Sequence, residues 1–295
     1  MSESVSSRTM TRRELDRALA RHPVVGSEPR RDIYGRLGVH PDRFKFRSLP
    51  MEAKVWAKSL VRHDTPKPFM IYGRPRSGTT LLVRLLDQVP AVRCDGELLH
   101  NFLFSPVGFL RRLPKRAGPG VQAYGMKLIS YHLMEVQRIR RPLAFFDHMG
   151  RHGYSVIHLT RNTWDQTLSL MKAQESGLYF SSKTTGEQTL RLDPGRFLDL
   201  LRWNKNMLDY EKAVMANVEH LGICYDRDLK EASSHQQTID RLCAHLGVPS
   251  APVSVVSRRT GGEGGLQRVD NIEELADRVR GSDLAHLVPD TAGAP

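Results

Sequence analysis

The stretch GRPRSGTT, residues 73–80, decides the fold class of this chain. The apolar run PFMIYG at 68–73 leads into it and predicts a buried strand. The segment TTLLVRLLDQ at 79–88 follows with helical spacing and stops before Pro90. A glycine-containing loop between a strand and a helix surrounds an anion with backbone N–H groups and the positive end of the helix dipole. The sequence therefore predicts a phosphate-binding loop at 73–80.

Further apolar runs alternate with helical segments along the rest of the chain. Strands are expected at 91–94, 122–129, 154–160 and 220–225, and helices at 11–21, 51–62, 162–176, 196–218, 229–246 and from Asn271 onward. Thr11 is a candidate N-cap of the helix at 11–21, and Asn162 or Thr163 of the helix at 162–176. This alternation predicts an α/β fold with a P-loop NTPase-like central parallel sheet of about five strands and helices on both faces.

The 295 residues divide into three sections. We expect a helical and irregular extension at 1–66 that packs on the core, an α/β domain at 67–289 and a loose tail at 290–295. The N-terminus lacks an apolar signal core, and no stretch of about 18 apolar residues predicts a transmembrane helix. The three cysteines have no paired spacing, which favours a reducing compartment, and we expect a cytoplasmic location.

The charge balance indicates anionic ligands. Lysine and arginine number 44 against 32 aspartates and glutamates, a surplus of 12. No helix-turn-helix, RNP or zinc-finger pattern is present, so nucleic acid is not an expected partner. The twelve histidines show no metal-ligand spacing.

The loop departs from the Walker pattern where a triphosphate would be recognised. Thr79 stands where that pattern has the lysine that reaches the β- and γ-phosphates, and the cation comes earlier, at Arg76. The loop is therefore poorly equipped for a nucleoside triphosphate. Its expected phosphate contacts are Arg74, Arg76, Ser77, Gly78, Thr79 and Thr80.

A second cluster follows the strand at 154–160, in the segment IHLTRNTWDQTLSL. Arg161 ends that strand, and Ser169 lies about two turns into the next helix, so both should face the sheet edge that carries the loop. A guanidinium and a hydroxyl can bind a second phosphate. Because Arg161 stands where a Walker B acid would hold Mg²⁺, we expect two phosphates and no metal.

These two segments together resemble the sulfotransferase family. GRPRSGTTLL is similar to its 5′-phosphosulfate loop, and LTRNTWDQTLSL to its 3′-phosphate motif, with Arg161 and Ser169 in the matching places. The resemblance covers about 70–100 and 154–175 and is closer to bacterial and carbohydrate-type members than to the cytosolic aryl type, which usually has Trp where this chain has Leu81. It implies the co-substrate 3′-phosphoadenosine-5′-phosphosulfate and the product adenosine 3′,5′-diphosphate.

The resemblance also implies roles for single residues. Arg76 would stabilise charge on the bridging and sulfuryl oxygens. Glu97 would take the proton of the acceptor, with His100 and His132 as rivals for that role. Lys127, near the end of the third strand, would bind sulfate oxygens or the acceptor, or else simply lie at a strand edge.

Two loops could close over the ligands. Arg258, Arg259 and Arg268 border a glycine-rich segment at 257–270 that would cover the 3′-phosphate or serve as a solvated linker. The polar segment 177–195 is a candidate acceptor lid.

The sequence predicts a sulfotransferase that acts on a hydroxyl or amine of a small-molecule or saccharide acceptor by metal-free in-line displacement. Two alternatives remain at this point. One is a nucleotide kinase or NTPase with a degenerate Walker loop, and the other is a nucleotide-binding protein without turnover. The acceptor and the oligomeric state are not readable from the residues.

Overall fold

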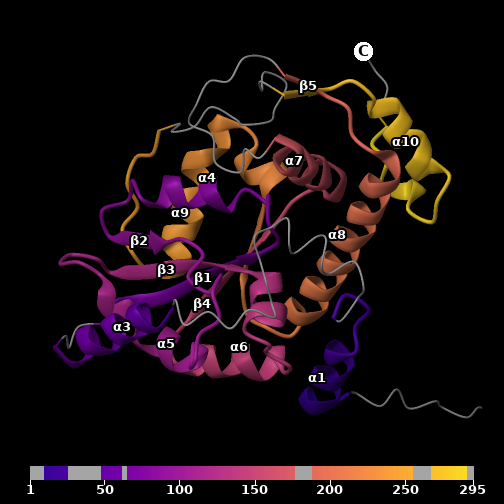
Figure 1. Ribbon diagram of the computed structural model, residues 1–295. Helices are drawn as coiled ribbons and strands as arrows, with labels where there is room; N and C mark the ends of the chain where they lie inside the picture. Colours follow the sequence, from indigo (N-terminus) through magenta and orange to yellow (C-terminus); the bar gives the residue numbers. More distant parts are fainter. Residues whose placement is uncertain (1–9, 26–47, 62–64, 177–187, 255–266, 291–295) are drawn as a thin grey trace, which may run out of the picture.

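The core of the protein is a sheet of five parallel strands in the order β2–β3–β1–β4–β6. The computed structural model describes residues 10–25, 48–61, 65–176, 188–254 and 267–290. The strands of the sheet are β1 (Lys67–Gly73), β2 (Val92–Asp95), β3 (Ala123–Ile129), β4 (Ser155–Thr160) and β6 (Leu221–Cys224). The predicted α/β class with a P-loop NTPase-like parallel sheet is confirmed (Figure 1).

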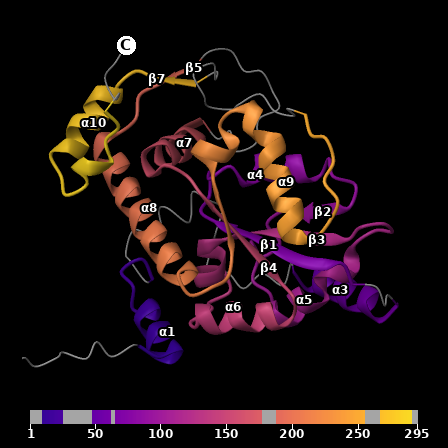
Figure 2. The same ribbon diagram turned by 180° about the vertical axis from the view of Figure 1, so that it is seen from behind.

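Helices cover both faces of this sheet, as the two views from opposite sides show (Figure 1, Figure 2). One face packs against α4 (Thr79–Leu86) and α9 (His235–Leu246). The other packs against α5 (Pro106–Arg112), α6 (Pro142–Arg151), α7 (Thr163–Ser176) and α8 (Pro194–Met215). In the central strand β1, Phe69 and Ile71 join the first apolar cluster, whereas Met70 and Tyr72 join the second. This period-2 alternation within a continuous apolar run is what burial on both faces requires.

Smaller elements surround the sheet. They are α1 (Arg12–Ala20), α3 (Leu49–Val61), α10 (Ile272–Arg280), the helical turns η2 (Leu113–Arg116), η3 (His132–Val136), η4 (Tyr225–Leu229), η5 (Ala232–Ser234) and η6 (Ala285–Leu287), and a two-stranded parallel sheet of β5 (Gln188–Leu190) and β7 (Gln267–Val269). Thr11 caps α1, as predicted, and the structure adds a capping box with Glu14. Asp16 on α1 accepts a hydrogen bond from the backbone N–H of Leu143 at 2.8 Å, which fixes α1 against the start of α6.

Some local expectations are wrong. The helix predicted from 229 begins only at His235, because residues 225–229 form the π-helical turn η4 and a 3₁₀ turn at 232–234 intervenes. The helix expected from Asn271 onward is present as α10, with Asn271 at its N-cap position but without a hydrogen bond from that side chain to the helix backbone. The Asn271 side chain instead pairs with the backbone N–H and C=O of Leu192, at 3.0 and 2.8 Å.

The arrangement brings five strand ends to one edge. Since all the strands run in the same direction, the loops after Gly73, Asp95, Ile129, Thr160 and Cys224 gather where ligands bind in such sheets. Within the described ranges, no helix is both long and apolar enough to cross a bilayer.

Candidate active site

The predicted phosphate loop runs from the end of β1 to the start of α4. Gly78 precedes α4 in a left-handed conformation, with φ of 98°. A Cβ atom at Gly78 would lie 2.3 Å from Cδ2 of Tyr225, and one at Gly73 would lie 2.5 Å from the carbonyl oxygen of Leu159. Both glycines are therefore required by the fold, and the first N–H groups of α4 open directly onto this loop.

Arg74 lies beneath the loop rather than at its open face. Its side chain is fully buried, with Nε 3.4 Å from Oε2 of the equally buried Glu211 on α8. Nη1 donates to the carbonyl oxygen of Asn204 at 2.9 Å, and Nη2 to that of Arg161 at 3.3 Å. Burial lowers the pKa of Arg74, and the negative charge of Glu211 opposes that shift. The phosphate contact expected of Arg74 is thus replaced by a structural role, because all three guanidinium nitrogens face core groups.

Other contacts fix the backbone of the loop from inside. The Ser77 hydroxyl is buried and donates to the carbonyl oxygen of Arg74 at 2.9 Å, so its proton is directed inward. Gln166 on α7 donates to the carbonyl oxygen of Pro75 at 2.6 Å. The loop carbonyls are thereby held away from the anion site. The backbone of Arg76 has a positive φ of 62°, which is unusual for a residue with a side chain.

The second predicted cluster meets this loop. Nε of Arg76 donates to the Ser169 hydroxyl at 3.2 Å, although the two residues are 93 positions apart. Nη1 of Arg161 donates to the carbonyl oxygen of Arg76 at 3.1 Å. Among the described residues, Nε of Arg161 is buried and has no hydrogen-bond partner. The structure therefore brings the two basic segments together in one cationic site. In this site Nε of Arg161 can still donate a hydrogen bond.

Tyr225 completes this site and was not singled out from the sequence. Its ring lies against Gly78, and the guanidinium carbon of Arg161 is 4.4 Å from the ring centroid, a cation–π contact. The signal that points to it is its place directly after β6, at the same sheet edge as Arg161.

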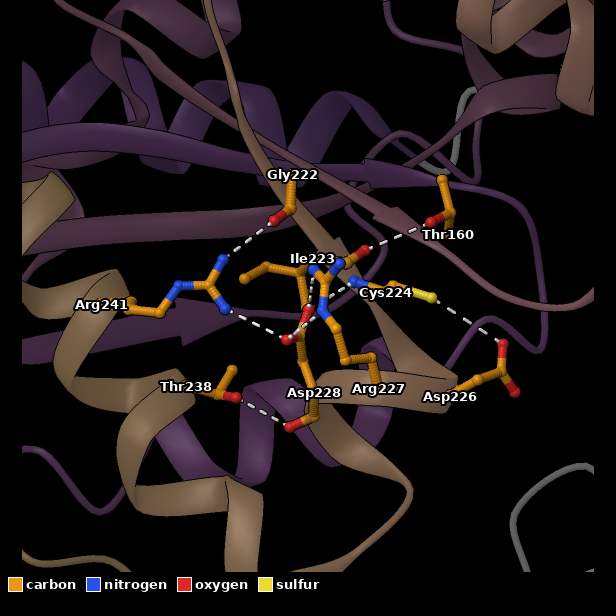
Figure 3. A network of polar contacts seen from close by, with 9 residues as sticks. All are labelled: Thr160, Gly222, Ile223, Cys224, Asp226, Arg227, Asp228, Thr238 and Arg241. Carbon is orange, nitrogen blue, oxygen red and sulfur yellow. Dashed lines mark hydrogen bonds and ion pairs between the residues drawn. The ribbon is translucent and has the colours of Figure 1, made fainter.

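The turn that carries Tyr225 is held by a network around Asp228 (Figure 3). The Asp228 carboxylate accepts from the backbone N–H of Cys224 at 2.7 Å, from Arg227 at 2.9 Å and from Arg241 at 3.1 Å. Thr238 donates to the carbonyl oxygen of Asp228 at 2.7 Å. Burial alone would raise the pKa of Asp228, but these donors outweigh it and hold the pKa below its usual value. Asp228 is thus an anion that fixes the turn after β6.

A third cluster joins the ends of β2 and β3. Lys127 Nζ lies 3.4 Å from Glu97 Oε1 and 3.4 Å from the Thr80 hydroxyl at the start of α4. The other carboxylate oxygen of Glu97 is 3.9 Å from Nε2 of His132, which in turn is 3.4 Å from Nδ1 of His100. Burial, with the nearby His100 and Lys127, lowers the pKa of His132 well below its usual value, so this imidazole is neutral. The three rival bases therefore lie in one group beside the loop.

A cavity of about 420 Å³ opens on the other side of Arg161. It lies at the carboxyl ends of β4 and β6 and is lined by Thr160, Arg161, Asn162, Asp165, Leu208, Lys212, Cys224, Asp226 and Lys230. Burial raises the pKa of Asp165, and the nearby Arg161 opposes that shift. The lining carries both signs of charge, unlike the cationic site between Arg76 and Arg161.

Three predicted residues belong to the glycine-rich segment at 257–270. Arg258 and Arg259, with residues 177–187, lie outside the described residues. Arg268 lies in β7, paired with Thr189 of β5, and is exposed.

Comparison with known proteins agrees with the resemblance seen in the sequence. Residues 68–136, which hold the phosphate loop, Glu97 and Lys127, match the model of the sulfotransferase family. Nodulation protein H of Rhizobium tropici is 33% identical over 129 residues, which is 38% of this chain and 49% of that protein. The chain thus spans about half the length of this curated bacterial relative. A crystal structure of mouse sulfotransferase SULT7A1 complexed with PAP aligns with a TM-score of 0.40 at 14% identity, covering 79% of this chain and 92% of that one. The sequence matches confirm the resemblance to the sulfotransferase family.

Proposed function

We propose that this chain transfers a sulfuryl group from 3′-phosphoadenosine-5′-phosphosulfate to a hydroxyl or amine of a small-molecule or carbohydrate acceptor. The observation that carries the proposal is the contact between Arg76 and Ser169, which brings the loop after β1 and the helix after β4 into one site. Such a site would offer two anion-binding halves, and this donor has two separate phosphate groups.

The first half would bind the 5′-phosphosulfate. The N–H groups at the start of α4 have no partners inside the helix, and the left-handed Gly78 brings the backbone close to the anion. Thr79 stands where a Walker lysine would reach a third phosphate, so a monophosphate ester fits this loop better than a triphosphate.

The second half would bind the 3′-phosphate through Arg161 and Ser169. The buried Nε of Arg161 lacks a partner among the described residues, and the Ser169 hydroxyl already lies within hydrogen-bond distance of Arg76. Charge-assisted hydrogen bonds of this kind contribute about 1.5–3 kcal/mol each. A phosphate here would give the buried Nε of Arg161 the acceptor that it lacks among the described residues.

The chemistry would rest on Arg76, Lys127 and Glu97. Transfer of a sulfuryl group places developing charge on the leaving and equatorial oxygens, where Arg76 and Lys127 would act as fixed cations. Glu97 would accept the acceptor proton. Its side chain is partly exposed and lies 3.4 Å from Lys127 Nζ, whereas the side chain of His132 is fully buried. This arrangement favours Glu97 over His132, and His100 remains its rival.

A transfer assay with labelled sulfate donor and a panel of hydroxyl and amine acceptors tests the proposal. We expect transfer by the wild type and a loss of at least about 100-fold in Glu97→Gln, the lower end of what a general base contributes. The matched control is Glu52→Gln, a carboxylate that accepts hydrogen bonds from the backbone N–H groups of Phe104 and Ser105. Full activity in Glu97→Gln would move the base to a histidine, and no transfer together with ATP-Mg²⁺ hydrolysis would reject the proposal.

A further inference from the structure

The group formed by Glu97, His100 and His132 has the composition of a transition-metal site. One ligand atom from each residue lies within 4.8 Å of the others. Two imidazoles and one carboxylate are the donor set of many three-ligand zinc sites, which keep the fourth position open. Nothing in the proposed transfer of a sulfuryl group requires such a set.

The separations match tetrahedral coordination. Zinc bonds of about 2.0–2.1 Å in a tetrahedron place neighbouring ligand atoms about 3.3 Å apart. Nδ1 of His100 and Nε2 of His132 are 3.4 Å apart, which is long for a hydrogen bond but suits two ligands of one ion. Oε2 of Glu97 is 3.9 Å from Nε2 of His132 and needs only a small side-chain movement.

We propose that Glu97, His100 and His132 bind a divalent transition metal ion, with Zn²⁺ the best match. The scaffold holds all three ligands in place. Glu97 and His100 share one turn, in which the backbone N–H of His100 donates to the carbonyl oxygen of Glu97 at 3.3 Å. His132 begins η3 directly after β3 and is fully buried. Lys127 holds Oε1 of Glu97, which leaves Oε2 directed at the histidines.

Two features limit the affinity. Nδ1 of His132 is buried without a hydrogen-bond partner among the described residues, whereas strong sites give the second ring nitrogen an acceptor. The positive charge of Lys127, 3.4 Å from Glu97, also opposes a dication. We expect binding in the micromolar range, short of the affinity of a structural zinc site.

Binding of the ion has a consequence that rests on the proposed function. A metal-bound Glu97 has its proton-accepting oxygen occupied, so micromolar Zn²⁺ would inhibit sulfuryl transfer reversibly, and a chelator would restore it. Metal binding itself does not depend on that function, since it needs neither nucleotide nor acceptor.

The test uses the purified full chain with Co²⁺ alone, whose visible absorption bands report tetrahedral nitrogen and oxygen coordination, followed by displacement with Zn²⁺. We expect the bands in the wild type and at least a 10-fold weaker apparent affinity in His100→Ala and in Glu97→Gln, two partly exposed positions where substitution should leave the fold intact. The matched control is His152→Ala, which alters an exposed histidine packed against His148 on the distant α6. Bands of unchanged strength in His100→Ala and Glu97→Gln, or no bands in the wild type, would overturn the proposal. A wild-type protein that transfers sulfuryl groups but binds no metal would reject this inference and leave the proposed function standing.

Discussion

The substitution Gly78→Ala tests the geometry of the phosphate loop. The new side chain would have to adopt the left-handed conformation at φ 98°, which costs about 1–2 kcal/mol for a residue with a Cβ atom. It would also approach Cδ2 of Tyr225 to 2.3 Å, and relieving such an overlap in a packed site costs about 1–3 kcal/mol. The total is about 2–5 kcal/mol.

This free energy can appear in either of two measurements. If the loop keeps its conformation, the free energy of unfolding falls by the full amount in a denaturant titration. If the loop moves to relieve the overlap, stability recovers but affinity for adenosine 3′,5′-diphosphate is lost, about tenfold for each 1.4 kcal/mol. We therefore expect the loss in stability and the loss in binding free energy, measured by calorimetry, to sum to at least about 2 kcal/mol.

Two comparisons separate the causes. Gly150→Ala, at an exposed helical position with open space around it, should leave both quantities unchanged or raise stability slightly. In a Tyr225→Ala background the ring is absent, so adding Gly78→Ala should cost only the conformational part, about 1–2 kcal/mol. A Gly78→Ala variant that matches the wild type in both stability and binding would refute the loop geometry described here.

Three further substitutions follow from the same structure. Arg76→Ala should lower the transfer rate at least about 100-fold, or about 3 kcal/mol, in steady-state kinetics at saturating donor, and near-normal turnover would remove Arg76 from the chemistry. Arg74→Met leaves the carboxylate of Glu211 buried without its guanidinium partner, so the free energy of unfolding should fall by about 3–5 kcal/mol. The fall should be smaller in the double variant Arg74→Met/Glu211→Met. A larger fall in the double variant would contradict the pairing. Asp228→Asn should lower stability at pH 7 by about 1–3 kcal/mol. Because folding lowers the pKa of Asp228, the contribution of this carboxylate to the free energy of unfolding is complete above the ordinary aspartate pKa of about 3.9 and is lost as the pH falls through the folded value. The stabilities of wild type and variant should therefore become equal in acid. A stability difference that does not change with pH would contradict this role.

The phosphate loop was predictable because its signal is local. The residues of β1, the glycines and the start of α4 are consecutive, so their types alone predict the strand, the turn and the helix. Arg161 and Ser169 were predictable for a similar reason, since a strand end and a helix two turns later face the same edge of a parallel sheet.

The role of Arg74 could not be predicted from its sequence neighbours. Its position in a basic loop indicates a phosphate contact, but its side chain turns inward to Glu211 and to the carbonyl oxygen of Asn204, 130 positions away. The direction of a long side chain depends on partners that only the packed fold supplies. The Tyr225 contact with Gly78 likewise depends on the π-helical turn after β6, which has no simple periodicity.

The proximity of Glu97 and the two histidines is a consequence of strand pairing. The sequence presents Glu97, His100 and His132 as competitors for one role, because nothing local indicates that β2 and β3 are neighbours. Helices α5 and α6 were missed although Pro106 and Pro142 stand at their first turns, a position that proline favours.

The central claim is that the cationic site has two separate phosphate-binding halves, and calorimetric titration with adenosine 3′,5′-diphosphate and adenosine 5′-monophosphate tests it most directly. We predict that wild-type protein binds the diphosphate at least about 10-fold more tightly without Mg²⁺, since a charge-assisted hydrogen bond contributes about 1.5–3 kcal/mol. In Arg161→Ala this preference should disappear while binding of the monophosphate persists. Equal affinity for the two nucleotides in the wild type, or tighter binding of ATP-Mg²⁺ than of the diphosphate, would contradict the claim.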